Sequence, residues 1–179
     1  MKIAPRNAVG RHRPSAIEGV FAPIYGLPCW GVNYGRYVNL SLNFGPPRLR
    51  IREPRSTVSR SVVVRRNAAR RLVTVKGRWW LWIYVSYWRL SYNGIVVSNR
   101  RWPAPRKMPD MLRDLEGQKL IRARVNSKTG ATRFDFDLGA KLEVWKVDDR
   151  EVYELWTLYV CAPQRRVFSL HSNGDLTSE

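Results

Sequence analysis

Arginine is the residue type whose number and spacing in this chain could do chemistry. Residues 48–71 contain nine Arg and a single acidic residue, Glu53. A guanidinium group is planar and always charged, and it binds phosphate or carboxylate through paired hydrogen bonds. This basic patch therefore predicts an anionic partner. Its candidate binding residues are Arg48, Arg50, Arg52, Arg60, Arg65, Arg66, Arg70 and Arg71.

A second, smaller basic cluster lies in residues 100–107. It adds Arg100, Arg101 and Trp102 to the candidate binding residues. Arginine interleaved with aromatic residues suits nucleic acid, because the cations contact the backbone and the rings stack on bases. No RNP, KH, zinc-finger or helix-turn-helix motif supports that interpretation further. We therefore predict a non-enzymatic interaction protein that binds an acidic protein partner, with nucleic-acid binding by residues 48–71 and 100–107 as the alternative.

The positive charge is concentrated in the first three-fifths of the chain. Residues 1–107 carry 21 Lys and Arg against 2 Asp and Glu, whereas residues 108–179 carry 11 against 12. The net charge of +18 at pH 7 thus arises from the first segment. A field concentrated in this way attracts polyanions or acidic protein surfaces.

The sequence offers little for catalysis. The chain has two histidines, His12 and His171, and two cysteines, Cys29 and Cys161. A cysteine nucleophile needs a histidine partner, and only Cys161 and His171 could meet, across the last expected hairpin. No Cys and His spacing fits a zinc site, and no Gly-rich phosphate loop is present. We predict that the protein is not an enzyme and has no catalytic residue, metal or cofactor.

Three carboxylates form an alternative cation site. Asp135 and Asp137 lie two residues apart on one predicted strand, and Glu143 follows on the next. Carboxylates in such an arrangement can hold a hard cation. Because Arg133 and Lys141 lie beside them, a solvated charged face is the simpler interpretation.

The elements that must position the arginines are strands. From Val38 to Phe44, apolar and polar residues alternate, which is typical of a strand with one wet face. Gly45-Pro46-Pro47 predicts a turn. Leu49 and Ile51 then alternate with arginines, which form the outer face of a second strand. For residues 53–76 a short helix, a strand pair and a mobile loop are all compatible with the sequence, and we favour a loop that ends in a partial strand.

The most apolar segment runs from Arg78 to Trp88, and both of its alternating faces are apolar. Such a strand is typically central in a sheet and covered on both sides. Asn93-Gly94, between β-rich runs, predicts a hairpin. Residues 109–116 have the start and stop signals of the one predicted helix, and β patterns follow it to the end.

The same order of features occurs twice in the chain. Two related β-meanders separated by one helix would explain it, although any two antiparallel meanders look alike at this level. We predict an α+β, mainly antiparallel β fold with an internal duplication and one short helix between the two meanders. The aligned pairs are 38–45 with 132–139, 81–84 with 155–159, and Asn93-Gly94 with Asn173-Gly174.

We expect residues 1–27 to be a partly disordered N-terminal arm and residues 28–179 to be one β-rich domain with halves 28–99 and 118–177. No run approaches the roughly 18–20 apolar residues of a membrane span, and no secretory signal follows the basic N-terminus. We therefore predict a cytoplasmic protein with free thiols and no membrane contact. The sequence does not indicate the oligomeric state.

Several strings in the chain resemble a family of uncharacterised bacterial proteins. The strings are Trp30-Gly31-x-x-Tyr34-Gly35, Leu42-Asn43-Phe44-Gly45, Leu81-Trp82-Ile83-Tyr84-x-x-x-Trp88-Arg89, Leu115-Glu116-Gly117-Gln118, Phe134-x-Phe136-Asp137-Leu138-Gly139, Leu155-Trp156-x-Leu158-Tyr159 and Asn173-Gly174. The resemblance covers most of residues 28–176, and the Leu-Trp-Ile-Tyr strand is its most specific part. It implies a His where Trp80 stands and a Cys where Ser86 stands, so any role of those two is absent here. It implies a compact bacterial β-rich domain and no activity.

Overall fold

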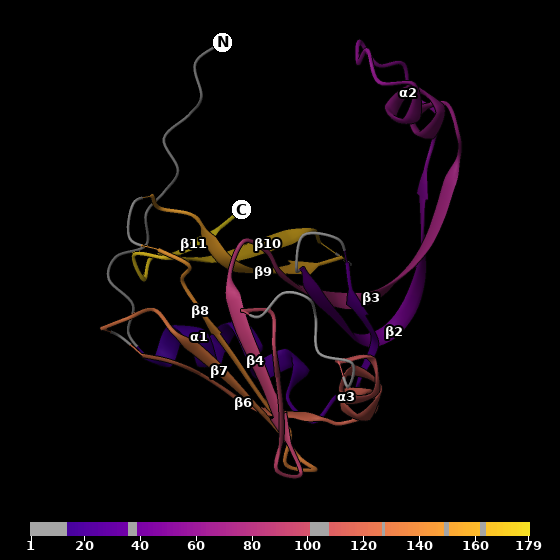
Figure 1. Ribbon diagram of the computed structural model, residues 1–179. Coiled ribbons are helices and arrows are strands. Elements are labelled where there is room, and N and C mark those ends of the chain that lie inside the picture. The colour runs from indigo at the N-terminus through magenta and orange to yellow at the C-terminus, as the bar shows by residue number, and fades with distance from the viewer. Residues whose placement is uncertain (1–13, 36–38, 101–107, 127, 149–150, 162–163) are drawn as a thin grey trace.

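The computed structural model describes residues 14–35, 39–100, 108–126, 128–148, 151–161 and 164–179. They form two antiparallel sheets with a few short helices, which confirms the predicted α+β, mainly β class (Figure 1). The six-stranded sheet comprises, in order, β1 (Cys29–Tyr34), β2 (Leu40–Arg52), β3 (Leu72–Ile83), β9 (Glu154–Val160), β10 (Arg166–His171) and β11 (Leu176–Ser178). The five-stranded sheet comprises β5 (Ile95–Ser98), β4 (Tyr87–Tyr92), β8 (Lys141–Trp145), β7 (Thr132–Phe136) and β6 (Leu120–Val125).

A single hydrophobic cluster joins the two sheets. Trp88 of β4 and Trp156 of β9 are its largest fully buried side chains. The indole N–H of Trp156 donates a hydrogen bond to Thr132 Oγ1 at 2.8 Å, so this buried polar group is satisfied. The apolar positions of the alternating strands supply much of the core, as the fully buried Leu42 and Leu142 show.

The predicted helix at 109–116 is confirmed as α3 (Met108–Leu115). Its apolar stripe is buried, and the backbone carbonyl of Leu115 accepts a hydrogen bond from Cys29 Sγ at 3.0 Å. The helix thus packs beside β1. No helix in the described part of the chain has the length and apolar character needed to cross a membrane.

Part of the segment expected to be an N-terminal arm is folded. Residues 1–13 lie outside the described residues, but Pro14–Phe21 form α1 and Ala22–Ile24 form a short 3-10 helix. The ring of Phe21 is fully buried and meets Trp156 edge-on, with 5.1 Å between ring centroids. These residues belong to the core because the apolar side chains of α1 cover one end of it.

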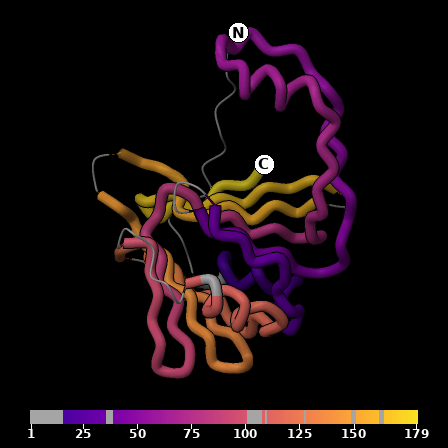
Figure 2. The backbone as a smooth tube through the Cα atoms, turned by 45° about the vertical axis from the view of Figure 1, so that its right-hand side comes forward, coloured from indigo at the N-terminus to yellow at the C-terminus, as the bar shows by residue number. Residues whose placement is uncertain are grey.

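Strands β2 and β3 continue well beyond the rest of the six-stranded sheet as a two-stranded ribbon (Figures 1 and 2). The ribbon ends in α2 (Val62–Ala68), which lies far from the body of the protein in both views. We call residues 47–76 the protruding hairpin. The loop predicted for residues 53–76 is therefore wrong in its middle, which is helical. The partial strand predicted at its end is confirmed as the first part of β3.

The turn predicted at Gly45-Pro46-Pro47 is also wrong. Strand β2 runs through this tripeptide, and its register with β3 shifts there by a bulge. A bulge accommodates one extra residue in one strand. A proline fits there because its missing N–H is not needed for a hydrogen bond to the partner strand. Gly45 has a φ of 72°, a left-handed conformation that glycine adopts without strain.

The structure does not show the internal duplication. Strands β2 and β7, which the sequence aligns, lie in different sheets. The two Leu-Trp strands, β3 and β9, pair directly with each other, with Leu81 opposite Leu158. The two halves do share one feature among the described residues, an Asn-Gly turn in a hairpin. These turns join β4 to β5 and β10 to β11.

Replacing Phe21 with Ala should lower the free energy of unfolding by about 3–5 kcal/mol, because it leaves a cavity beside Trp156. Val58→Ala is the control, since Val58 is fully exposed and its loss should change stability by no more than about 0.5 kcal/mol. Urea unfolding followed by circular dichroism measures both. A Phe21→Ala protein as stable as Val58→Ala would show that α1 is not part of the core.

Candidate functional site

The protruding hairpin has one cationic and one apolar face, because residues alternate along both of its strands. On the cationic face, Arg48 lies opposite Lys76 and Arg50 lies opposite Thr74. The apolar face consists of Leu49, Ile51, Val73 and Val75, each at least 50% exposed. The outer face predicted for this strand from the sequence is therefore present, on a ribbon that projects from the body.

The tip of the hairpin is held together by two of its own arginines. The Arg52 guanidinium donates hydrogen bonds to the backbone carbonyls of Asn67 and Arg70. The Arg65 guanidinium donates to the carbonyl of Arg60 at 2.8 Å. These two predicted binding residues therefore contribute to the shape of the tip.

Glu53, the acidic residue of the basic patch, forms an ion pair with Arg71 at 2.8 Å. The remaining guanidinium groups of the predicted site are exposed and have no hydrogen-bond or ion-pair partner among the described residues. They are Arg48, Arg50, Arg60, Arg66 and Arg70. The hairpin thus presents uncompensated positive charge to its surroundings.

The second predicted cluster is only partly described, because Arg101 and Trp102 lie outside the described residues. The guanidinium carbon of Arg100 lies 5.7 Å from the centre of the Tyr87 ring. Arg100 lines a groove over the five-stranded sheet together with Arg89 and Arg124. The groove at the base of the protruding hairpin is lined by other residues, so the structure does not bring Arg100 to the hairpin.

The outer face of the six-stranded sheet carries a row of stacked aromatic side chains, which we call the aromatic ladder: Trp80, Trp82, Tyr84 and Tyr159. Trp80 stacks on Trp82 and on Tyr159, with ring centroids 5.7 Å and 4.9 Å apart. Trp82 stacks on Tyr84 at 5.0 Å. Three of the rings are half-buried and Tyr84 is exposed. The prediction that both faces of this strand are covered is therefore wrong, although β3 is central in its sheet.

A groove of about 480 Å³ joins the aromatic ladder to the cationic face of the hairpin. Trp80 and Tyr159 form its aromatic wall. The described residues that line it also include Leu49, Ile51 and five cationic side chains, and no Asp or Glu. The cationic residues are Arg48, Arg50, Lys76, Arg165 and Arg166.

Lys76 connects the two parts of the groove. Its ammonium nitrogen lies 3.7 Å from the centre of the Trp80 ring, a cation–π contact. Burial, and then the charge of Arg50, lower the pKa of Lys76 below its usual value. An anion bound in this groove would stabilise the charged form of Lys76 and offset its repulsion by Arg50.

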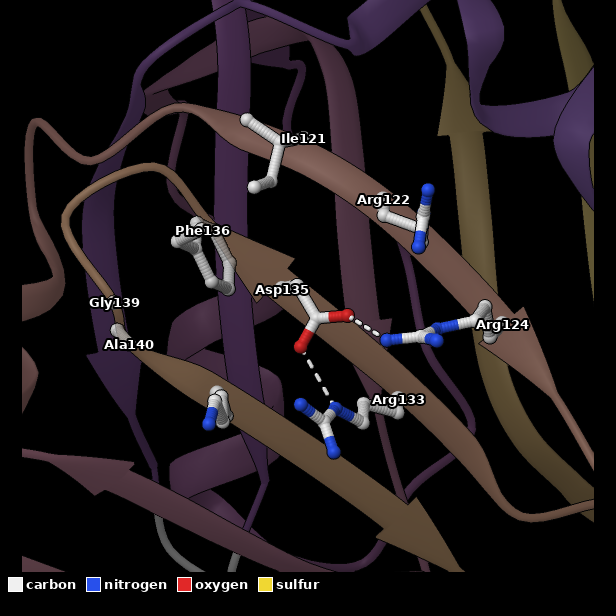
Figure 3. Close-up of a pocket in the computed structure, with 9 residues that line it drawn as sticks. Ile121, Arg122, Arg124, Arg133, Asp135, Phe136, Gly139 and Ala140 are labelled. Atoms are coloured by element: carbon white, nitrogen blue, oxygen red, sulfur yellow. Dashed lines mark hydrogen bonds and ion pairs between the residues drawn. The ribbon is translucent and has the colours of Figure 1, made fainter.

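The three carboxylates considered as a cation site are each bound by other groups of the protein itself. In a pocket on the five-stranded sheet, Asp135 lies between Arg124 and Arg133 and accepts a hydrogen bond of 2.7 Å from each (Figure 3). Burial opposes ionisation of Asp135, but the two arginines outweigh it and hold the pKa of Asp135 below its usual value.

The other two carboxylates are also engaged. Asp137 accepts a hydrogen bond of 2.8 Å from the Lys119 backbone N–H, and Glu143 accepts one of 2.8 Å from Arg89. Within the described residues, no group of three or more His, Cys, Asp and Glu is placed to hold a metal ion. Asp135 and Glu143 are thus held in ion pairs with arginines, and Asp137 is held by a backbone N–H.

Cys29, Cys161 and His171 are the cysteines and the histidine that the structure describes. Cys29 is buried and burial raises its pKa to about 12, which disfavours the reactive thiolate. His171 Nε2 lies 3.1 Å from Thr177 Oγ1. Across the part of the chain that the structure describes, Cys161 and His171 form no hydrogen bond with each other.

The aromatic ladder is the feature that sequence reasoning missed, although a signal for it exists. Asn43 and Ser41, on the predicted wet face of β2, lie opposite Trp80 and Trp82. Residues opposite each other share a face of the sheet, so a wet face on β2 implies an open face on β3. Comparisons with known protein families, with curated proteins and with solved structures find no match for this chain.

Replacing Asp135 with Asn should destabilise the protein by about 1–3 kcal/mol at pH 7, because two arginines lose their charged acceptor. Because folding lowers the pKa of Asp135, this carboxylate makes its whole contribution to wild-type stability at any pH above the ordinary carboxyl pKa. This contribution disappears as the pH falls through the lower folded-state value. Urea unfolding of both proteins at pH 7 and at about pH 2 measures this. A difference in stability that persists unchanged in acid would contradict this prediction.

The control is Glu53→Gln, because Glu53 belongs to an exposed ion pair. This substitution should cost at most about 1 kcal/mol.

Proposed function

We propose that this protein is a non-enzymatic binding protein whose ligand is nucleic acid, held by the cationic face of the protruding hairpin and the groove at its base. The observation that carries the proposal is the set of exposed guanidinium groups on a projecting two-stranded ribbon, which have no partner among the residues that the structure describes. Residues 47–76 contain ten basic residues and one acidic residue. Guanidinium groups bind phosphates through paired hydrogen bonds and release counterions as they do so.

The positions of Arg48 and Lys76 on the hairpin support a role in binding a ligand rather than a role in stabilising the fold. Arg48 lies directly opposite Lys76, and like charges in that position destabilise a strand pair. A phosphate backbone would remove the repulsion by neutralising both side chains at once. Association would be fast, because a field of this strength steers polyanions towards the hairpin.

An acidic protein partner is the second candidate function, and the apolar face of the hairpin favours it. Leu49 and Ile51 are 69% and 55% exposed, and burial of apolar side chains is common at the centre of protein interfaces. In this case the arginines would pair with carboxylates at the rim. A cytoplasmic setting, with Cys29 and Cys161 as the free thiols they are in the structure, belongs to both proposals.

Labelled oligonucleotides of about 16 nucleotides should bind, and the affinity should fall steeply between about 50 and 200 mM salt. The double variant Arg48→Ala/Arg50→Ala should make the slope of log K against log salt shallower by about 0.7 for each lost contact to a single strand. Fluorescence anisotropy measures both quantities. The reduced slope is the diagnostic result, because contacts to phosphate and not to the protein core are removed.

The charge-matched control is Arg113→Ala/Arg122→Ala, which removes two exposed arginines from the body. It should leave the slope nearly unchanged. Binding of polyglutamate without binding of any oligonucleotide would favour the acidic protein partner. Failure to bind oligonucleotides at low salt, or equal slopes in the two double variants, would contradict the nucleic-acid proposal.

A further inference from the structure

The aromatic ladder bears on which form of nucleic acid the protein binds. Cationic side chains attract single and double strands alike through their phosphates. In a duplex the faces of the bases are covered by their neighbours, whereas a single strand can stack its bases on aromatic side chains. We infer that the aromatic ladder stacks unpaired bases and that the bound nucleic acid is single-stranded. This inference rests on the proposed function and deepens it.

The ring geometry leaves room for bases. The planes of Trp80 and Trp82 differ by 18° with centroids 5.7 Å apart, and those of Trp82 and Tyr84 by 24°. Atoms in contact are about 3.5–4 Å apart, so centroids at these distances belong to rings that are offset sideways and overlap only in part. Trp80 has Trp82, Tyr159 and the Lys76 ammonium close to its ring, so the room for a base lies towards Tyr84. Tyr84, at the end of the row, is 43% exposed.

The charge next to the ladder matches a nucleic-acid strand and not a neutral ligand. The groove lined by Trp80 and Tyr159 is also lined by Lys76, Arg48 and Arg50. A strand whose bases lie on the ladder would place its phosphates among these cations. Aromatic rings beside a cationic track are the two components of sites that hold single strands.

Two polar side chains on the same face, Asn43 and Thr157, already form hydrogen bonds within the protein. Asn43 Oδ1 accepts a hydrogen bond from the Gly77 N–H at 3.0 Å. Thr157 Oγ1 donates to Glu154 at 3.1 Å and lies 3.0 Å from Ser169 Oγ. These groups have little capacity left to read base edges, and stacking alone distinguishes bases weakly. We therefore expect binding that tolerates changes of base sequence.

The direct test compares three probes with the wild-type protein: a thymidine strand of about 16 nucleotides, the same strand without bases, and a duplex of equal length. The strand with bases should bind about 5- to 100-fold more tightly than the abasic strand, because only it can stack. Trp82→Ala should remove most of that advantage and leave the affinity for the abasic strand unchanged. Trp82→Phe, which keeps a ring, should retain much of it.

Trp145→Ala is the matched control, since Trp145 is a half-buried indole on the five-stranded sheet. It should bind all three probes as the wild type does. Equal affinities for strands with and without bases, or tighter binding of the duplex, would overturn the inference while leaving salt-dependent binding by the hairpin intact. Absence of binding to every probe would overturn the inference and the proposed function together. Unchanged affinity for the abasic strand shows that Trp82→Ala is folded, and Tyr84→Ala offers a second variant at an exposed position.

Discussion

The antiparallel pairing of β2 with β3 runs from Leu40 opposite Ile83 to Arg52 opposite Leu72, and the other features of the molecule depend on it. Along the inner part of this strand pair one face lies in the core and the other carries the aromatic ladder. Along the outer part the same alternation continues without a core to cover, and it separates guanidinium groups from apolar side chains. Position along one strand pair thus decides whether a residue stabilises the fold or is available to a partner.

The bulge at Gly45-Pro46-Pro47 makes this continuity possible. It lets β2 pass from the sheet into the hairpin while the register with β3 changes by one residue. The hydrogen bond from the Gly77 N–H to Asn43 Oδ1 secures the partner strand at that point. A side chain at Gly77 would meet backbone atoms of Phe44 and Trp79 within 3 Å, so the close approach of the two strands requires glycine there.

Alternation in the sequence predicted many of the strands, because it depends on local side-chain direction, but it did not predict β1. The start and stop signals of residues 109–116 predicted α3, and alternation predicted the arginine face beside Leu49 and Ile51. It did not predict the extended hairpin, since Gly-Pro-Pro occurs at turns as well as at bulges. Nor did it predict the open face of Trp80 and Trp82. That face depends on which strands pair and on where the chain leaves one side of a sheet uncovered, and a single sequence does not contain that information locally.

The indole N–H resonances of the tryptophans provide the most direct test of a binding surface on the outer face of β3. A single strand with bases, added to isotopically labelled protein, should shift the indole signals of Trp80 and Trp82 and leave those of the buried Trp88 and Trp156 in place. Shifts confined to other tryptophans, or no shifts under conditions where the strand is bound, would contradict the account.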